Sequence, residues 1–246
     1  MMDFDLEICV NSIESAMAAQ AGGASRIELC DNMAEGGTTP SAGLISRSKK
    51  KLNIPVFPII RPRGGDFLYS DEEFEVMKQD IKYCKEQGCE GVVIGILKAD
   101  GSIDTERCTD LILQARPMQV TFHRAFDRCN DLQKGLEDII SLGCERVLTS
   151  GGEITATNAI FTLSRLVNQA MGRIIIMAGS GINENNIIDL ALKTGIKEFH
   201  SSAKSTINTK MSYQGVGKLA ELDGRFSIRE SNVAKIEGLK KALLQL

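Results

Sequence analysis

Short apolar runs alternate with longer amphipathic stretches along the whole chain. The apolar runs have the length of strands, and the amphipathic stretches have helical spacing and helix-start signals. The runs predict eight strands, at residues 6–10, 26–30, 56–61, 91–97, 119–123, 146–149, 174–178 and 197–200. The stretches between them predict helices at residues 41–51, 71–87, 105–115, 131–142, 156–171 and 184–193. Strands and helices that take turns in this way predict a parallel sheet.

The number of units favours an α/β fold of the (β/α)8 TIM-barrel type. Eight strand–helix units in 246 residues match the size of such a barrel, with an open doubly wound sheet as the alternative. No G-x-G-x-x-G sequence follows the first strand, which weakens the alternative and gives no indication of a nucleotide cofactor. We therefore predict a single domain over residues 1–246, with a long loop at about 201–232 and a closing helix at about 233–244.

Composition excludes several classes of function. The net charge is -3, and the basic residues form no extended run, so we expect no nucleic-acid partner. The N-terminal residues lack the pattern of a signal peptide, and no apolar stretch approaches the ~20 residues of a membrane span. We expect a cytoplasmic protein without a membrane partner. Seven cysteines without a C-x-x-C pair indicate neither a disulfide framework nor a structural zinc site.

The inward face of the predicted barrel is unusually polar. Side chains in a strand alternate between two faces, and the apolar set should pack against the helices. The opposite set then lines the barrel, where Val, Ile and Leu are the rule. This set comprises Glu7, Cys9, Arg26, Glu28, Cys30, Thr121, His123, Glu198 and His200. A buried charge is costly unless it is paired, so for Arg26 and Glu198 we expect an internal ion pair.

Four of these side chains are candidates for acid/base catalysis: Glu7, Glu28, His123 and His200. They lie toward the carboxyl ends of their strands, the rim at which barrel active sites are found. Histidine titrates close to neutral pH, and this chain has only two, both at strand ends. The simpler alternative is that each histidine is a hydrogen-bonded packing residue.

Other side chains near the same rim are suited to bind a small anion. Arginine guanidinium groups follow the third strand, and glycine-rich turns after the sixth and seventh strands let backbone N–H groups approach an anion. The candidate substrate-binding residues are Arg61, Arg63, Arg124, Asp127, Ser150, Gly151, Gly179, Ser180 and Gly181. In the alternative interpretation, Arg124 and Asp127 pair with each other and hold the loop around His123.

Several long motifs are similar to those of the CutC family of copper homeostasis proteins. They occur in the family's order at residues 61–67 (RPRGGDF), 121–127 (TFHRAFD), 148–152 (LTSGG), 176–182 (IMAGSGI) and 199–203 (FHSSA). The resemblance implies a (β/α)8 barrel, a cytoplasmic location, a homo-oligomer such as a dimer or tetramer, and a role in copper homeostasis. For some members it also implies binding of Cu(I).

Copper and catalysis make different demands on these residues. Cu(I) prefers thiolate and thioether ligands, so Cys9 and Cys30, on adjacent strands, are the candidate metal ligands. The alternative is two buried thiols without a metal.

The second predicted function is an enzyme that acts by acid/base chemistry on a small anionic metabolite, such as a phosphorylated one. A third is a binding protein whose pocket is vestigial. The expected partner is therefore a copper ion or a small anionic molecule.

Overall fold

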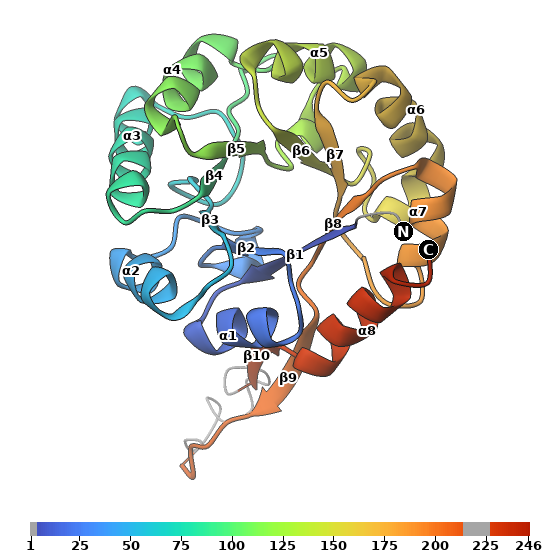
Figure 1. The fold of residues 1–246 in the computed structure, drawn as a ribbon. Helices are drawn as coiled ribbons and strands as arrows, with labels where there is room; N and C mark the ends of the chain where they lie inside the picture. Colours follow the sequence, from blue (N-terminus) through green and yellow to red (C-terminus); the bar gives the residue numbers. More distant parts are fainter. Residues whose placement is uncertain (1–3, 214–226) are drawn as a thin grey trace.

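Eight parallel strands form a barrel in the computed structural model, which describes residues 4–213 and 227–246 (Figure 1). The strand order is β3-β2-β1-β8-β7-β6-β5-β4, and a parallel bridge between Ile59 and Val93 joins the two ends of this series. The strands are β1 (Asp5–Val10), β2 (Arg26–Leu29), β3 (Val56–Pro58), β4 (Gly91–Ile94), β5 (Gln119–Phe122), β6 (Arg146–Thr149), β7 (Ile175–Ala178) and β8 (Glu198–Ser201). The predicted (β/α)8 fold is confirmed.

Helices surround the barrel on its outside (Figure 1). They are α1 (Ile13–Ala21), α2 (Ala42–Lys51), α3 (Asp71–Glu86), α4 (Thr105–Ala115), α5 (Leu132–Leu142), α6 (Ile160–Ala170), α7 (Ile187–Thr194) and α8 (Val233–Leu243). Helix α1 was not among the predicted helices. It is short and rich in alanine, so its apolar stripe is weak, but Ser12 caps its first turn by accepting a hydrogen bond from the Ser15 N–H. No helix in the described ranges is both long and apolar enough to cross a bilayer.

The alternation of side chains along the strands separates two apolar clusters. Outward residues such as Leu6, Ile8 and Val10 are fully buried between the strands and the helices, in the main core. Inside the barrel lies a smaller cluster, formed by Cys9, Cys30, Phe57, Ile59 and Val93, with Met33 packed against it. The interior is therefore only partly apolar, and charged side chains occupy much of the rest.

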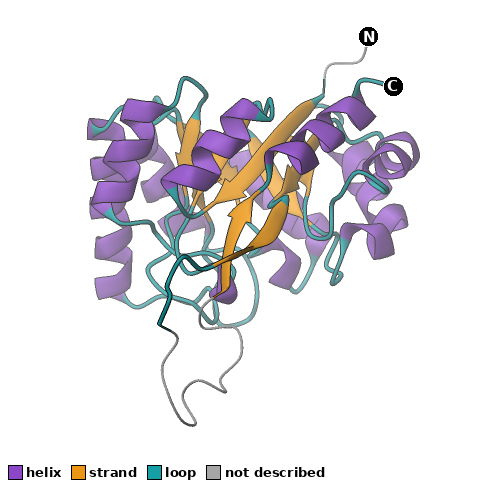
Figure 2. Cartoon of the chain, turned by 90° about the horizontal axis from the view of Figure 1, so that it is seen from below, coloured by secondary structure: helices purple, strands orange, loops and turns teal. Residues whose placement is uncertain are grey.

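The segment predicted as a long loop at 201–232 contains two strands that the sequence pattern did not indicate. Strands β9 (Lys204–Asn208) and β10 (Ser227–Ser231) pair antiparallel, and residues 214–226 lie outside the described residues. The Ser231 N–H donates to Ser15 Oγ at 3.1 Å, which attaches β10 to α1. Figure 2 shows these two strands at the end of the barrel opposite the C-terminus. Strand β9 follows β8 directly and pairs with β10, so both lie beside the rim where the barrel strands end.

Candidate functional site

Strand register brings the predicted polar residues together at one rim. Glu7 on β1 pairs in register with His200 on β8, and Cys9 on β1 with Glu28 on β2. Glu7, Glu28 and His123 are each at most 5% exposed, and the His200 side chain is 13% exposed. The alternation therefore assigns these side chains to the barrel interior correctly, although it does not show which ones touch.

A chain of oppositely charged side chains crosses the interior. It includes the expected pair of Arg26 and Glu198, and it extends through Arg146, which the sequence did not single out. At one end, Arg146 Nε lies 3.1 Å from Glu198 Oε2, and Glu198 also pairs with Arg26. Arg26 Nε lies 2.5 Å from Glu7 Oε2, and the other oxygen of this carboxylate, Oε1, lies 2.7 Å from His200 Nδ1. At the other end, His200 Nε2 lies 3.7 Å from Glu28 Oε2. The signs alternate along this chain, so each buried charge has an opposite neighbour.

The position of a group in this chain sets its pKa. Burial alone would raise the pKa of Glu7, but the charge of Arg26 and the hydrogen bond with His200 lower it to about 2. Burial alone would lower the pKa of His200, but its contacts with Cys9 and Glu7 and the charge of Glu28 raise it well above 6.5. Burial raises the pKa of Glu28, which His200 only partly offsets. Near neutral pH, Glu7 is an anion and His200 a cation.

Glu7→Gln removes the closest carboxylate from His200, so we expect the pKa of His200 to fall by at least one unit, about 1.4 kcal/mol. Long-range ¹H–¹⁵N NMR of the imidazole rings measures this, because the chain has only two histidines to assign. Glu137→Gln is the control, because Glu137 pairs with Arg173 on the surface. An unchanged pKa in Glu7→Gln would contradict the electrostatic role of Glu7.

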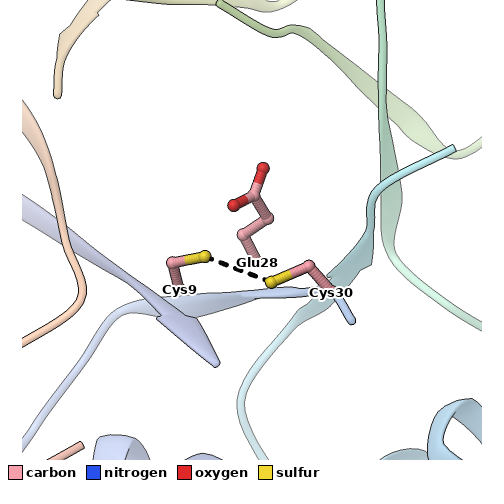
Figure 3. Close-up of side chains that lie close together, drawn as sticks. All are labelled: Cys9, Glu28 and Cys30. Carbon is pink, nitrogen blue, oxygen red and sulfur yellow. Dashed lines mark hydrogen bonds between the residues drawn. The ribbon is translucent and has the colours of Figure 1, made fainter. Parts of the chain in front are cut away.

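Three sulfur atoms meet at the carboxyl ends of β1 and β2. Cys9 Sγ lies 3.3 Å from Cys30 Sγ, and Met33 Sδ lies 3.5 Å from Cys9 Sγ and 2.8 Å from Cys30 Sγ. Figure 3 shows the two thiols pointing toward each other, with Glu28 extending beside them. Ligand atoms of Cys9, Glu28 and Cys30 lie within 4.8 Å of one another. We call Cys9, Cys30 and Met33 the sulfur cluster.

Sequence reasoning missed Met33. The signal was its position three residues after Cys30, but a methionine at that spacing is ordinary in any chain. A left-handed residue, Asn32 (φ 44°), precedes the short 3-10 turn Met33–Glu35. This turn folds the loop after β2 back over the barrel, which brings the thioether to the thiols. Only the loop conformation makes Met33 part of the site.

His123 occupies a different environment from His200. The Ala125 N–H donates to His123 Nδ1 at 3.1 Å, so the neutral ring carries its proton on Nε2. Burial, with the nearby charge of Arg61, lowers the pKa of His123 to about 3. The Nε2 atom is buried and has no hydrogen-bond partner within residues 4–213 and 227–246. The ring lies with its centroid 5.0 Å from that of Phe67. His123 is therefore neutral where His200 is charged.

Arg124 and Asp127 pair with each other, and Asp127 holds the loop after β6. Arg124 Nε donates to Asp127 at 2.7 Å, and Asp127 accepts hydrogen bonds from the Ser150 and Gly152 N–H groups. The Gly151 N–H donates to the Thr149 hydroxyl at 2.8 Å. The pairing of Arg124 with Asp127 agrees with the alternative interpretation from the sequence, but the loop that Asp127 holds through these bonds is the one after β6 and not the loop around His123.

The second glycine turn and Arg63 are also engaged within the protein. The Gly179 N–H donates to the Thr149 carbonyl at 2.9 Å, and the Ser180 hydroxyl donates to the Ile154 carbonyl at 2.6 Å. Gly181 has a φ of 75°, a left-handed value that favours glycine. Arg63 pairs with Asp66 and Glu73.

A cavity of about 1140 Å³ opens at this rim. It is bounded by Cys9 and Met33 of the sulfur cluster on one side and by the loops after β3, β4, β5, β7 and β8 on the others. Of the predicted site residues, the cavity is lined by Cys9, Glu28, Arg61, His123, Arg124, Asp127, Ser180, Gly181 and His200. The residues not among its lining are Glu7, Cys30, Arg63, Ser150, Gly151 and Gly179.

Comparisons with known proteins agree with this architecture. The model of the CutC family matches residues 4–205. A CutC family protein of Chromobacterium violaceum is 46% identical over 98% of this chain and 99% of its own length. The human copper homeostasis protein cutC homolog is 47% identical over 96% of this chain and 88% of its own length.

Solved structures extend the comparison to the fold. The crystal structure of a CutC protein from Streptococcus agalactiae has a TM-score of 0.78 at 34% identity, and the match covers 81% of this chain and 98% of that one. Phosphoribosyl anthranilate isomerase from Thermotoga maritima has a TM-score of 0.60 at 13% identity, covering 99% and 100%, which shows a shared fold alone. By its family match and its close relatives, the chain belongs to the CutC family of copper homeostasis proteins.

Proposed function

We propose that this protein binds Cu(I) in copper homeostasis, with Cys9, Cys30 and Met33 as the ligands. The observation that carries the proposal is the sulfur cluster, in which every pair of sulfur atoms lies within 3.5 Å. Two thiols and a thioether are the soft donor set that Cu(I) prefers over harder divalent ions. The names of close relatives, which refer to copper homeostasis, agree with this choice.

Copper must displace thiol protons, because the thiolate is the metal ligand. The hydrogen bond with Cys30, burial and the charge of Glu28 raise the pKa of Cys9 well above 9. The affinity for Cu(I) is therefore lowest at low pH, where displacing the thiol protons is most unfavourable. Glu28 is suited to receive a released proton, since its pKa is raised and its carboxylate lies beside the two thiols. A reducing, cytoplasmic location fits the proposal, because oxidised thiols do not bind Cu(I).

A competition titration with a chromophoric Cu(I) chelator tests the ligand set. Relative to the wild-type protein, we expect Cys30→Ser to bind Cu(I) at least a hundredfold more weakly, about 2.7 kcal/mol, and Met33→Leu roughly tenfold more weakly. The matched control is Cys144→Ser, because Cys144 is also a buried free thiol but lies outside the sulfur cluster. Undiminished affinity in Cys30→Ser would remove this site from consideration.

The alternative predicted from the sequence, an acid/base enzyme, stays a prediction. Its two candidate carboxylates, Glu7 and Glu28, are not equally suited to accept a proton. Glu7 is held as an anion by Arg26 and His200, and a pKa of about 2 makes it a weak base near neutral pH. Glu28 has a raised pKa and lines the cavity, so it is the better proton acceptor of the two.

A further inference from the structure

Two buried N–H donors at the wall of the cavity have no acceptor in the part of the chain that the structure describes. His123 Nε2 and Arg61 Nε both lack a hydrogen-bond partner there, and their residues are 3% and 4% exposed. The bond from the Ala125 N–H to His123 Nδ1 leaves the ring proton on Nε2, so this atom is a donor. Leaving a buried donor unpaired is unfavourable, because the group loses its bonds to water without a replacement. Two such donors against one cavity indicate an acceptor that belongs to a ligand.

Arg61 also has no ion-pair partner among the described residues. Its two terminal nitrogens donate to the backbone carbonyls of Glu35, Gly37 and Gly65, at 2.7, 2.7 and 2.9 Å. Among the described residues, no carboxylate oxygen lies within the 4.0 Å that defines an ion pair with this guanidinium. Other buried arginines of the barrel, such as Arg26, do have carboxylate partners. A buried cation without a direct ion pair is the feature expected of an anion site before the ligand arrives.

One aromatic ring touches both donors. The Phe67 ring centroid lies 5.0 Å from the His123 ring centroid, and the Arg61 guanidinium carbon lies 5.0 Å above the Phe67 ring. Phe67 belongs to the loop between β3 and α3 and is only partly buried. On the other side of His123, a Cβ atom on Gly95 would lie 2.5 Å from the imidazole ring. The imidazole is thus held between Gly95 and Phe67, a partly buried loop residue that also lines the cavity.

We propose that the cavity binds a small molecule through a carboxylate or phosphate group, which His123 Nε2–H and the Arg61 guanidinium receive after Phe67 moves aside. The neutral imidazole donates one hydrogen bond, and Arg61 supplies the opposite charge. Arg63, Arg124 and the N–H groups of Gly151 and Gly179 are already engaged within the protein, so they do not take this role. The site uses no residue of the sulfur cluster, and its ligand carries at least one oxyanion.

Fluorescence of Phe67→Trp tests the proposal, because the chain contains no tryptophan and the new indole is the only one. The probes are inorganic phosphate, glucose 6-phosphate and succinate, each compared with chloride at the same ionic strength. We expect saturable emission changes with at least one oxyanion and none with chloride. In Phe67→Trp/His123→Asn, the same probe should bind at least tenfold more weakly. Phe161→Trp, an exposed site on α6, is the control and should not respond.

A second measurement covers the case in which the new indole itself blocks the site. In the wild-type protein, the probe should shift the ¹⁵N resonance of His123 Nε2 and leave His200 unchanged. No response in either experiment, or binding that His123→Asn leaves intact, overturns the proposal. Cys30→Ser should retain the anion response, so failure of copper binding and failure of this site are distinguishable.

Discussion

Arg26→Met is expected to lower the free energy of unfolding by about 3–5 kcal/mol. The side chain is 5% exposed and pairs with both Glu7 and Glu198 inside the barrel. The charges of these two carboxylates raise the pKa of Arg26 despite its burial, so it stays protonated. Without the guanidinium, Glu198 keeps only Arg146 and Glu7 keeps only His200. Methionine fills a similar volume, so lost pairing dominates the effect.

Urea denaturation of the wild-type and variant proteins measures this loss. Arg173→Met is the matched control, because Arg173 also pairs with a glutamate, at 2.8 Å, but both side chains are at least 40% exposed. A surface pair of this kind contributes less than about 1 kcal/mol. Similar losses in the two variants would show that the interior chain of charges contributes no more than a solvated pair.

Acid is expected to destabilise the protein through His123 before it protonates the paired carboxylates. The pKa of His123 is lowered from 6.5 to about 3 in the folded protein, so below pH 6.5 the unfolded state binds the proton first. Stability from this group is complete above pH 6.5 and falls as pH decreases. Between pH 6.5 and 4.5 the loss is about 2–3 kcal/mol.

Other groups act outside this range or in the opposite direction. The raised pKa of His200 contributes stability that is complete below pH 6.5 and is lost only above it. The lowered pKa of Glu7 contributes stability that is lost below pH 4.5. The raised pKa of Glu28 destabilises the folded state at higher pH, and this effect is relieved as pH falls toward 4.5. Comparison with a variant is therefore needed to isolate His123.

His123→Asn is that variant, because its amide oxygen can accept the Ala125 N–H but does not titrate. Free energies of unfolding measured in urea at pH 6.5 and 4.5 should fall by about 2–3 kcal/mol more in the wild-type protein than in His123→Asn. Parallel pH dependence in the two proteins would mean that His123 titrates normally in the folded state.

Much of the site followed from the two-residue period of the strands. This period assigned Cys9, Cys30, Glu28 and His200 to the barrel interior without knowledge of any contact. A strand packs only one of its two sets of side chains against the helices, so the other set must face inward. The same reasoning predicted the pair of Arg26 and Glu198.

Features that depend on loops or weak patterns were missed. Helix α1 has too little amphipathic contrast to stand out, and strands β9 and β10 lie in a segment without a clear apolar period. Met33 reaches the thiols only because Asn32 adopts a left-handed conformation. Such turns depend on what the surrounding structure stabilises, and this information is not local.

The sequence by itself determined the barrel and the inward position of strand side chains such as Glu7, Glu28, His123 and His200, because alternation and motif order are local properties of the chain. The tertiary structure alone decided what each side chain experiences. His123 and His200 occupy equivalent places at strand ends, yet one is a neutral ring beside Arg61 and the other a cation between Glu7 and Glu28. Burial and neighbouring charge set a pKa, and both come from residues distant in the sequence.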